Sequence, residues 1–127
     1  MAICYKQRKV ANQVENMTVI GDVKGKNVVI VDDMCDTAGT LTKAADLMMK
    51  HSALSVRAIC THPVLSGPAY ERIANSSLQE LIVTDSIPLR TDVDTSKITV
   101  LPVHDMFAQT LRCLMANKSI SSQFTLQ

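Results

Sequence analysis

The stretch Val28–Thr40, VVIVDDMCDTAGT, decides the fold. It begins with four consecutive β-branched residues, Val28–Val31, and such a run predicts a strand buried on both faces, as in the middle of a parallel sheet. Two carboxylates, Asp32 and Asp33, follow where this strand is expected to emerge at its carboxyl end. In open α/β sheets, ligands bind just outside the carboxyl ends of the strands. The acidic pair is therefore a candidate binding feature, although an ordinary strand-to-helix connection also carries such residues.

A turn of small and hydroxyl-bearing residues follows the acidic pair. This turn, Asp36–Thr40, precedes an amphipathic segment in which Leu41, Ala44, Ala45 and Met48 recur at helical spacing, and Thr40 is the expected N-cap. Backbone N–H groups at such a turn and helix N-terminus point outward and carry partial positive charge, which suits a phosphate.

The turn and the acidic pair together predict a site for a phosphorylated sugar. The acids would repel a second phosphate but accept hydrogen bonds from hydroxyl groups, so a sugar phosphate fits better than a bare polyphosphate. The residues expected to bind it are Asp32, Asp33, Asp36, Thr37, Ala38, Gly39 and Thr40.

The rest of the chain alternates strand and helix patterns. Further strands are expected at Ser55–Cys60, Leu81–Thr84 and Ile98–Leu101, and helices at 68–75 and 103–117. One side of the last helix is apolar, through Phe107, Leu111, Leu114 and Met115. This alternation predicts one α/β domain with a doubly wound, mainly parallel sheet flanked by helices. The role of His62, which precedes Pro63, stays open between a ligand or base and a structural or partner contact.

Composition limits the function classes. The chain has 127 residues, a formal net charge of +1 and 46% hydrophobic residues, which suits a single domain and argues against nucleic-acid binding or a basic membrane-binding surface. No apolar run approaches the ~18 residues of a membrane span, and no secretory signal pattern occurs at the N-terminus. The cysteines are scattered, at Cys4, Cys35, Cys60 and Cys113, which is typical of a cytoplasmic protein without a disulfide framework or metal site.

One further glycine-containing turn resembles a nucleotide motif only superficially. Gly21, Gly25 and Lys26 have a spacing one residue short of a P-loop, no Ser or Thr follows the lysine, and the turn precedes a strand. We therefore do not assign it to a nucleotide.

Four stretches together resemble one family. These are GDVKGKNVVIVDDMCDTAGTLTKAADLM, CTHPVLSG, TDSIPL and SISSQF, in this order along the chain. They resemble the ribose-phosphate pyrophosphokinases, also called phosphoribosyl pyrophosphate synthetases, which belong to the type I phosphoribosyltransferase-like proteins. The resemblance covers nearly all of the chain, and ordinary phosphoribosyltransferases share neither THPVLSG nor the C-terminal tail.

The resemblance implies a reaction and a domain organisation. The family transfers pyrophosphate from ATP to ribose 5-phosphate, using Mg²⁺, and gives phosphoribosyl pyrophosphate and AMP. Family members are at least about twice as long as this chain, have two similar α/β domains and assemble as homo-oligomers, by resemblance hexamers. We therefore expect residues 1–127 to be a single C-terminal domain, incomplete at its N-terminus and inactive by itself. The ATP pocket and most Mg²⁺ ligands are expected in the missing parts.

The resemblance also assigns residues near both ends of the chain. A mobile catalytic loop in the family carries a Lys-Arg-Arg motif. It matches residues 6–8 of this chain, so residues 1–16 are expected to be a remnant of that loop. The resemblance makes Lys6 and Arg8 the catalytic positions, while Gln7 departs from the motif. Near the C-terminus, three residues match a regulatory site for phosphate or ADP, namely Ser119, Ser121 and Phe124. A capping tail is the alternative for these last residues.

Two other functions stay open. A phosphoribosyltransferase shares the phosphate-binding turn but attacks C1 of the sugar with a base and needs no ATP. A non-catalytic regulatory partner assembles with active synthetase subunits and has no turnover of its own.

Overall fold

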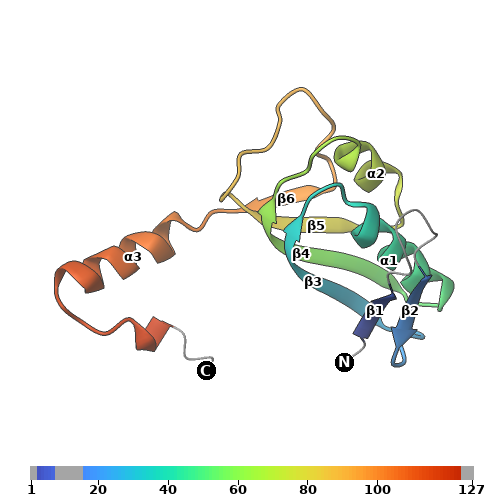
Figure 1. Ribbon diagram of the computed structural model, residues 1–127, viewed down its shortest axis with the longest axis horizontal. Coiled ribbons are helices and arrows are strands. Elements are labelled where there is room, and N and C mark those ends of the chain that lie inside the picture. The colour runs from blue at the N-terminus through green and yellow to red at the C-terminus, as the bar shows by residue number, and fades with distance from the viewer. Residues whose placement is uncertain (1–2, 8–15, 124–127) are drawn as a thin grey trace.

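A four-stranded parallel sheet forms the centre of the computed structural model, which describes residues 3–7 and 16–123. The strands are β1 (Ile3–Gln7), β2 (Asn16–Ile20), β3 (Asn27–Cys35), β4 (Ser55–Pro63), β5 (Glu80–Thr84) and β6 (Ile98–Leu101). The helices are α1 (Gly39–Lys50), α2 (Ala69–Asn75), α3 (His104–Met115) and the short 3₁₀ helix η1 (Ser121–Gln123). Figure 1 shows their arrangement.

The sheet has the strand order β3-β4-β5-β6, and all neighbouring pairs are parallel. Val31 pairs with Ile59, and Ile59 pairs with Ile82, so β-branched residues of three strands form a row across the sheet. The α/β fold with a parallel sheet is thus confirmed. The antiparallel pair β1–β2 is a separate two-stranded sheet, which Figure 1 shows beside the start of β3.

Helices α1 and α2 pack against the same face of the sheet. The core between them contains buried side chains of β4 and β5 together with apolar side chains of both helices. Val56, Ala58 and Leu81 are fully buried there, which follows from the alternation of side chains along a strand. This packing fixes α1 and the turn that precedes it relative to the carboxyl ends of β3 and β4.

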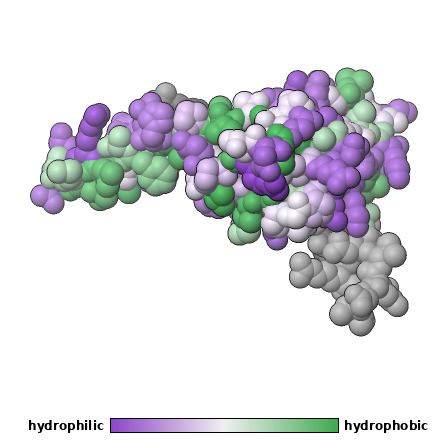
Figure 2. All heavy atoms as spheres, turned by 90° about the horizontal axis from the view of Figure 1, so that it is seen from above, coloured by the Kyte–Doolittle hydropathy of each residue, from purple (hydrophilic) through white to green (hydrophobic). Residues whose placement is uncertain are grey.

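The opposite face of the sheet is open in the described part of the chain. Val29, Val31 and Ile59 are exposed there, and Arg57 and Glu80 form an ion pair with 3.3 Å between the Arg57 Nε and Glu80 Oε2 atoms. Figure 1 shows α3 projecting away from the sheet, and α3 has no buried residue. In the space-filling view of Figure 2, hydrophobic atoms gather along the projecting helix.

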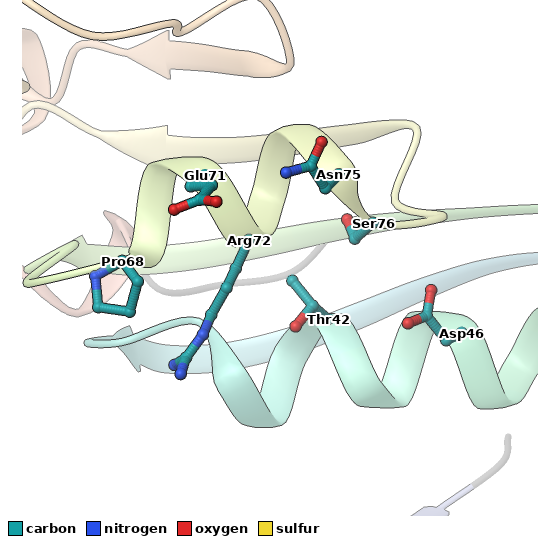
Figure 3. Close-up of a pocket in the computed structure, with 7 residues that line it drawn as sticks. All are labelled: Thr42, Asp46, Pro68, Glu71, Arg72, Asn75 and Ser76. Atoms are coloured by element: carbon teal, nitrogen blue, oxygen red, sulfur yellow. The ribbon is translucent and has the colours of Figure 1, made fainter.

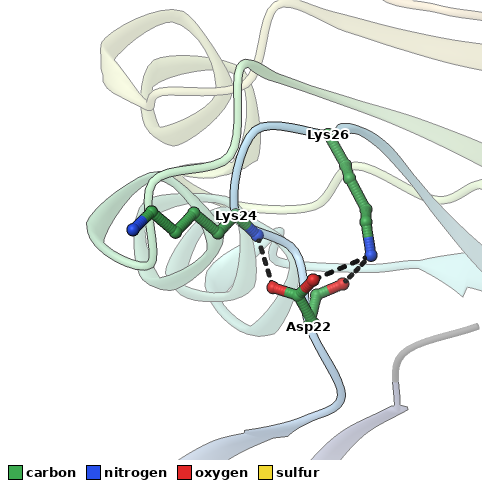
Figure 4. Close-up of polar contacts among 3 residues, drawn as sticks. All are labelled: Asp22, Lys24 and Lys26. Atoms are coloured by element: carbon green, nitrogen blue, oxygen red, sulfur yellow. Dashed lines mark hydrogen bonds and ion pairs between the residues drawn. The ribbon is translucent and has the colours of Figure 1, made fainter.

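The turn before β3 is fixed by its own side chains. The carboxylate of Asp22 accepts hydrogen bonds from the Lys24 N–H group and the Lys26 ammonium group, each at 3.0 Å (Figure 4). The hydrogen bond from Lys26 is the main cause that lowers the pKa of Asp22. Because Lys26 is already paired, this turn has no resemblance to a phosphate-binding loop beyond its glycines.

Three predictions were wrong. Val28–Val31 do not form a central strand buried on both faces: β3 is the edge strand of the sheet, and no element in the described ranges covers the face on which Val29 and Val31 are exposed. The other two were wrong by a few residues. The strand does not end before Asp32 and Asp33 but continues to Cys35, because pairing with β4 continues through Met34 with His62 and Cys35 with Pro63. Thr40 is not the N-cap of α1; Ala38 is, and the carbonyl oxygen of Ala38 accepts the first helical hydrogen bond, from the Thr42 N–H group.

Of the predicted loop at 1–16, the structure describes residues 3–7, which form β1, and Asn16, which begins β2. The rest of that prediction lies outside the described residues. No helix in the described ranges combines the length and the apolar character that crossing a membrane requires.

Candidate phosphate-binding site

The turn between β3 and α1 has the backbone geometry of an anion site. Ala38 adopts a left-handed conformation, with φ 57° and ψ 2°, and α1 begins at the next residue, Gly39. No side chain caps the helix, and its first turn contains no acidic residue. A helix N-terminus carries partial positive charge and four N–H groups that lack helical partners. Here neither a capping side chain nor an acidic residue of the first helical turn neutralises that charge.

Three successive carbonyl groups of the turn face the segment after β4. The carbonyl oxygen of Cys35 accepts a hydrogen bond from the Leu65 N–H group at 3.0 Å, and that of Asp36 accepts one from the Ser66 N–H group at 3.1 Å. The carbonyl oxygen of Thr37 accepts one from Nη1 of Arg72 at 2.9 Å. Within the described ranges, the N–H groups of Thr37, Gly39 and Leu41 donate no hydrogen bond.

A small hollow lies at this turn, with a volume of about 150 Å³. Drug-sized ligand pockets are about 300–1,000 Å³, so the hollow suits a compact group. Residues from the end of β3, the turn and the start of α1 line it: Asp32, Met34, Cys35, Asp36, Thr37, Ala38, Gly39, Thr40 and Leu41. The structure thus brings together all the predicted sugar-phosphate residues except Asp33, which does not line the hollow.

The acidic pair is exposed at the end of β3. Asp32 and Asp33 both face solvent, and the Asp33 N–H group donates to Oδ1 of Asp32 at 3.0 Å. The third acid, Asp36, accepts a short hydrogen bond from the Ser66 hydroxyl group through its carboxylate. Asp32 and Asp36 both line the hollow, and Asp36 is also tied to the neighbouring loop.

The cysteine in the site is not an activated nucleophile. Burial, followed by the proximity of Cys60 and Asp32, raises the pKa of the Cys35 thiol to about 12. The pKa of the Cys60 thiol is also raised, mainly by burial. Reactive cysteines have a lowered pKa, so the chemistry of this site does not run through a thiolate.

His62 belongs to a hydrogen-bonded group at the same edge of the sheet. Its Nδ1 atom lies 3.0 Å from the Ser86 hydroxyl oxygen, and that hydroxyl group donates to the carbonyl oxygen of Thr61 at 3.0 Å. The Thr84 hydroxyl group donates to the same carbonyl oxygen at 2.7 Å. These contacts tie the end of β4 to the residues after β5, so His62 has a structural partner.

The described residues among those assigned to the chain ends lie apart from the hollow. Lys6 lies in β1, and Figure 1 shows β1 near the start of β3, at the other end of that strand from the turn. Ser119 and Ser121 follow α3, and their hydroxyl oxygens lie 2.7 Å apart. Arg8 and Phe124 lie outside the described residues.

Sequence reasoning did not identify Ser66 and Arg72, whose side chains bond to the turn. Both come from the segment between β4 and the middle of α2, about thirty residues after the turn. The local sequence around them contains no signal for this contact, because only the folded chain places the two segments together. Within residues 3–7 and 16–123 there is no group of three His, Cys, Asp or Glu side chains that could hold a metal ion.

Comparisons with known proteins agree with the fold and identify the family. The model of the phosphoribosyl synthetase-associated domain family matches residues 5–125. The ribose-phosphate pyrophosphokinase of Helicobacter hepaticus is 53% identical over 124 residues, and that of Campylobacter jejuni is 50% identical over 124 residues. Each alignment covers 98% of this chain but only 40% of the relative.

A solved structure also matches most of this chain while the match covers only part of that protein. The phosphoribosylpyrophosphate synthetase of Mycobacterium smegmatis matches with a TM-score of 0.78 and 35% identity, over 90% of this chain and 37% of that protein. The chain thus spans about 40% of the length of the relatives. It belongs to the phosphoribosyl synthetase-associated domain family, and its relatives are ribose-phosphate pyrophosphokinases.

Proposed function

We propose that this chain supplies the ribose 5-phosphate site of a ribose-phosphate pyrophosphokinase. The observation that carries the proposal is the arrangement of the turn. Its carbonyl groups at 35, 36 and 37 all bond to the segment at 65–72, while the N–H groups of Thr37, Gly39 and Leu41 donate no hydrogen bond within the described ranges. Such concave groups of N–H donors bind phosphate.

In this proposal, different residues bind the phosphate group and the hydroxyl groups of the sugar phosphate. The backbone N–H groups of Asp36–Thr40 and the hydroxyl groups of Thr37 and Thr40 bind the 5-phosphate. Asp32 and Asp33 accept hydrogen bonds from the ribose 2- and 3-hydroxyl groups. Their exposure at the carboxyl end of β3 supports this role, because a carboxylate that faces solvent is accessible to a ligand. The hollow of about 150 Å³ has room for the phosphate, so the ribose ring lies outside it.

The proposed reaction of the longer protein is the transfer of the β,γ-pyrophosphoryl group of ATP to the C1 hydroxyl group of ribose 5-phosphate. Lys6 and Arg8 stabilise the charge that develops on the transferred phosphates. Since this reaction type depends on positioning and electrostatics, it needs no covalent intermediate. A regulatory site at Ser119, Ser121 and Phe124 and an oligomeric assembly are part of the same proposal.

The chain by itself is proposed to bind but not to react. In this proposal the metal and ATP are held mainly by other parts of the longer protein. Three or four charge-assisted hydrogen bonds contribute roughly 5–12 kcal/mol, and association costs about 4–15 kcal/mol. Since these two ranges nearly cancel, we expect the isolated chain to bind ribose 5-phosphate only weakly.

A substitution in the turn tests the phosphate site. In Gly39→Val the added Cβ atom would lie 3.1 Å from Nη1 of Arg72 and 3.9 Å from the hydroxyl oxygen of Thr37, so the groups that form the turn must shift, and ribose 5-phosphate binding should be lost in a calorimetric or NMR titration. Ala116→Val adds a valine at the exposed end of α3 and should leave binding unchanged. Unchanged binding by folded Gly39→Val would refute the phosphate site.

An assay of the complete gene product tests the reaction. AMP release in the presence of ATP, Mg²⁺ and ribose 5-phosphate is expected. Binding of a purine or pyrimidine base without any need for ATP would instead indicate a phosphoribosyltransferase, and assembly without turnover would indicate a regulatory partner.

A further inference from the structure

Arg72 reaches from α2 across to the start of α1. It lines a hollow of about 340 Å³ between these two helices, together with Thr42, Asp46, Pro68, Glu71, Asn75 and Ser76. Figure 3 shows its side chain extending from α2 past this hollow toward the first turn of α1. Arg72 is thus placed to act on the phosphate-binding turn and not only within its own helix.

The guanidinium group contacts the turn at two points. Its Nη1 atom donates to the carbonyl oxygen of Thr37 at 2.9 Å. A Cβ atom added at Gly39 would lie only 3.1 Å from the same Nη1 atom. Arg72 therefore packs against the residue that begins α1 and binds the carbonyl group two residues before it.

This hydrogen bond completes a series that fixes the direction of the turn. Leu65 and Ser66 bond to the carbonyl groups of Cys35 and Asp36, and Arg72 bonds to the next one, Thr37. Because the C=O and N–H groups of a planar trans peptide point in opposite directions, carbonyl groups held toward the segment at 65–72 turn the intervening N–H groups away from it. Of these three donors, Arg72 is the one provided by a charged side chain.

The charge of Arg72 also lies beside the helix N-terminus. No carboxylate in the described ranges forms an ion pair with it. Its positive charge therefore adds to that of the α1 N-terminus, where an anion is stabilised. A hydrogen bond from an ionised donor is also stronger than one between neutral groups.

We propose that Arg72 is a positioning residue, which holds the Asp36–Thr40 turn in its phosphate-binding conformation and increases the positive field at the site. This inference rests on the proposed function, because it deepens the account of the same site. Removing the guanidinium group should weaken binding of ribose 5-phosphate about tenfold to a hundredfold, the range expected for one charge-assisted hydrogen bond.

The test is an NMR titration of backbone N–H groups in three variants. Arg72→Met removes the charge and the donors while keeping the length of the side chain, Arg72→Lys restores a charge and a donor, and Glu71→Gln is the control on the neighbouring helix position. We expect weaker ribose 5-phosphate binding by Arg72→Met, partial recovery by Arg72→Lys, and unchanged binding by Glu71→Gln. Without ligand, Arg72→Met should shift the amide signals of Thr37–Thr40 and Arg72→Lys should largely restore them, at similar melting temperatures.

A double-mutant cycle provides a second measurement in which the arginine is retained. The Cβ atom of Gly39→Ala displaces the guanidinium group and should weaken binding in the wild-type background. In the Arg72→Met background, Gly39→Ala should cause a clearly smaller further loss of ribose 5-phosphate binding, since the two substitutions act through one contact.

The outcomes separate this inference from the proposed function. If the wild-type chain does not bind ribose 5-phosphate, the proposed function fails. If the wild type binds it and folded Arg72→Met binds it equally well, only the role of Arg72 is overturned. Equal further losses from Gly39→Ala in both backgrounds would also overturn that role.

Discussion

Helices α1 and α3 differ in a way that their sequences do not reveal. Both have twelve residues, both follow a strand of the parallel sheet, and both have a continuous apolar side. The apolar residues of α1 are buried, among them Leu41, Ala45 and Met48. Those of α3 are more than half exposed: Phe107, Leu111, Leu114 and Met115. An amphipathic pattern therefore predicts a helix and its apolar side, but not whether the chain itself covers that side.

The two helices are alike where only local geometry matters. Each ends with a residue in the left-handed conformation, Ser52 after α1 and Asn117 after α3. In each case the next N–H group bonds back into the last helical turn, from Ala53 to Met48 and from Lys118 to Cys113. This is the Schellman motif, which depends only on nearby residues. The same local ending thus occurs on a packed helix and on an unpacked one.

Cysteine reactivity should show the largest difference between the two regions. The pKa of the Cys35 thiol, raised to about 12 from an ordinary value of 9.0, leaves about a thousandfold less thiolate at pH 8. Cys113 on α3 is free and only half-buried. We expect iodoacetamide to modify Cys113 well before Cys35, as measured by peptide mass spectrometry over time. Equal rates in the folded protein would contradict the packing of the turn, and unfolding in urea should remove the difference.

The same pKa shift makes stability depend on pH. Because the pKa of Cys35 is higher in the folded than in the unfolded chain, its contribution is present below pH 9 and is lost as the pH rises from 9 toward 12. The urea midpoint should therefore fall above pH 9. Cys35→Ala should reduce this fall, whereas Cys113→Ala should not.

Truncation of one methionine in each helix should give the next largest difference between α1 and α3, measured as the change in the free energy of unfolding. Met48→Ala removes a side chain that is 3% exposed and should lower the free energy of unfolding by about 2–5 kcal/mol. Met115→Ala changes a side chain that is 87% exposed and should stay within about 0.5 kcal/mol of wild type. Urea unfolding at pH 7 measures both values. A comparable loss in both variants would show that α3 is packed in solution.

Substitutions at the C-terminal ends of the two helices should change the free energy of unfolding least. Ser52→Gly relieves a left-handed conformation that serine adopts at a cost, so the free energy of unfolding should increase by about 0.5–1 kcal/mol. Asn117→Gly should change it less, because asparagine tolerates this conformation and α3 is not packed on the core. Thermal unfolding of the two variants tests this order, and a larger gain from Asn117→Gly would reverse it.

Most of the fold and part of the site follow from local sequence. The β-branched run at Val28–Val31 predicts a strand, and the spacing of Leu41, Ala44, Ala45 and Met48 predicts a helix; both are found, as β3 and α1, but the predicted central position of the strand was wrong, because β3 lies at the edge of the sheet. The acidic pair and the small-residue turn predict where a sugar phosphate would bind. The exact end of β3 and the N-cap of α1 could not be predicted, because pairing with β4 and the left-handed conformation of Ala38 decide them.

The sequence by itself thus determined the order of strands and helices from β3 to α3, the family and the position of the candidate site, since all of these depend on residues close together along the chain, whereas the β1–β2 pair was not predicted. Only the tertiary structure decided which groups hold the turn and which apolar side stays open. The hydrogen bonds of Ser66 and Arg72 to the turn join residues 30 and 35 positions apart. Contacts over such separations exist only after the sheet has brought the two segments together.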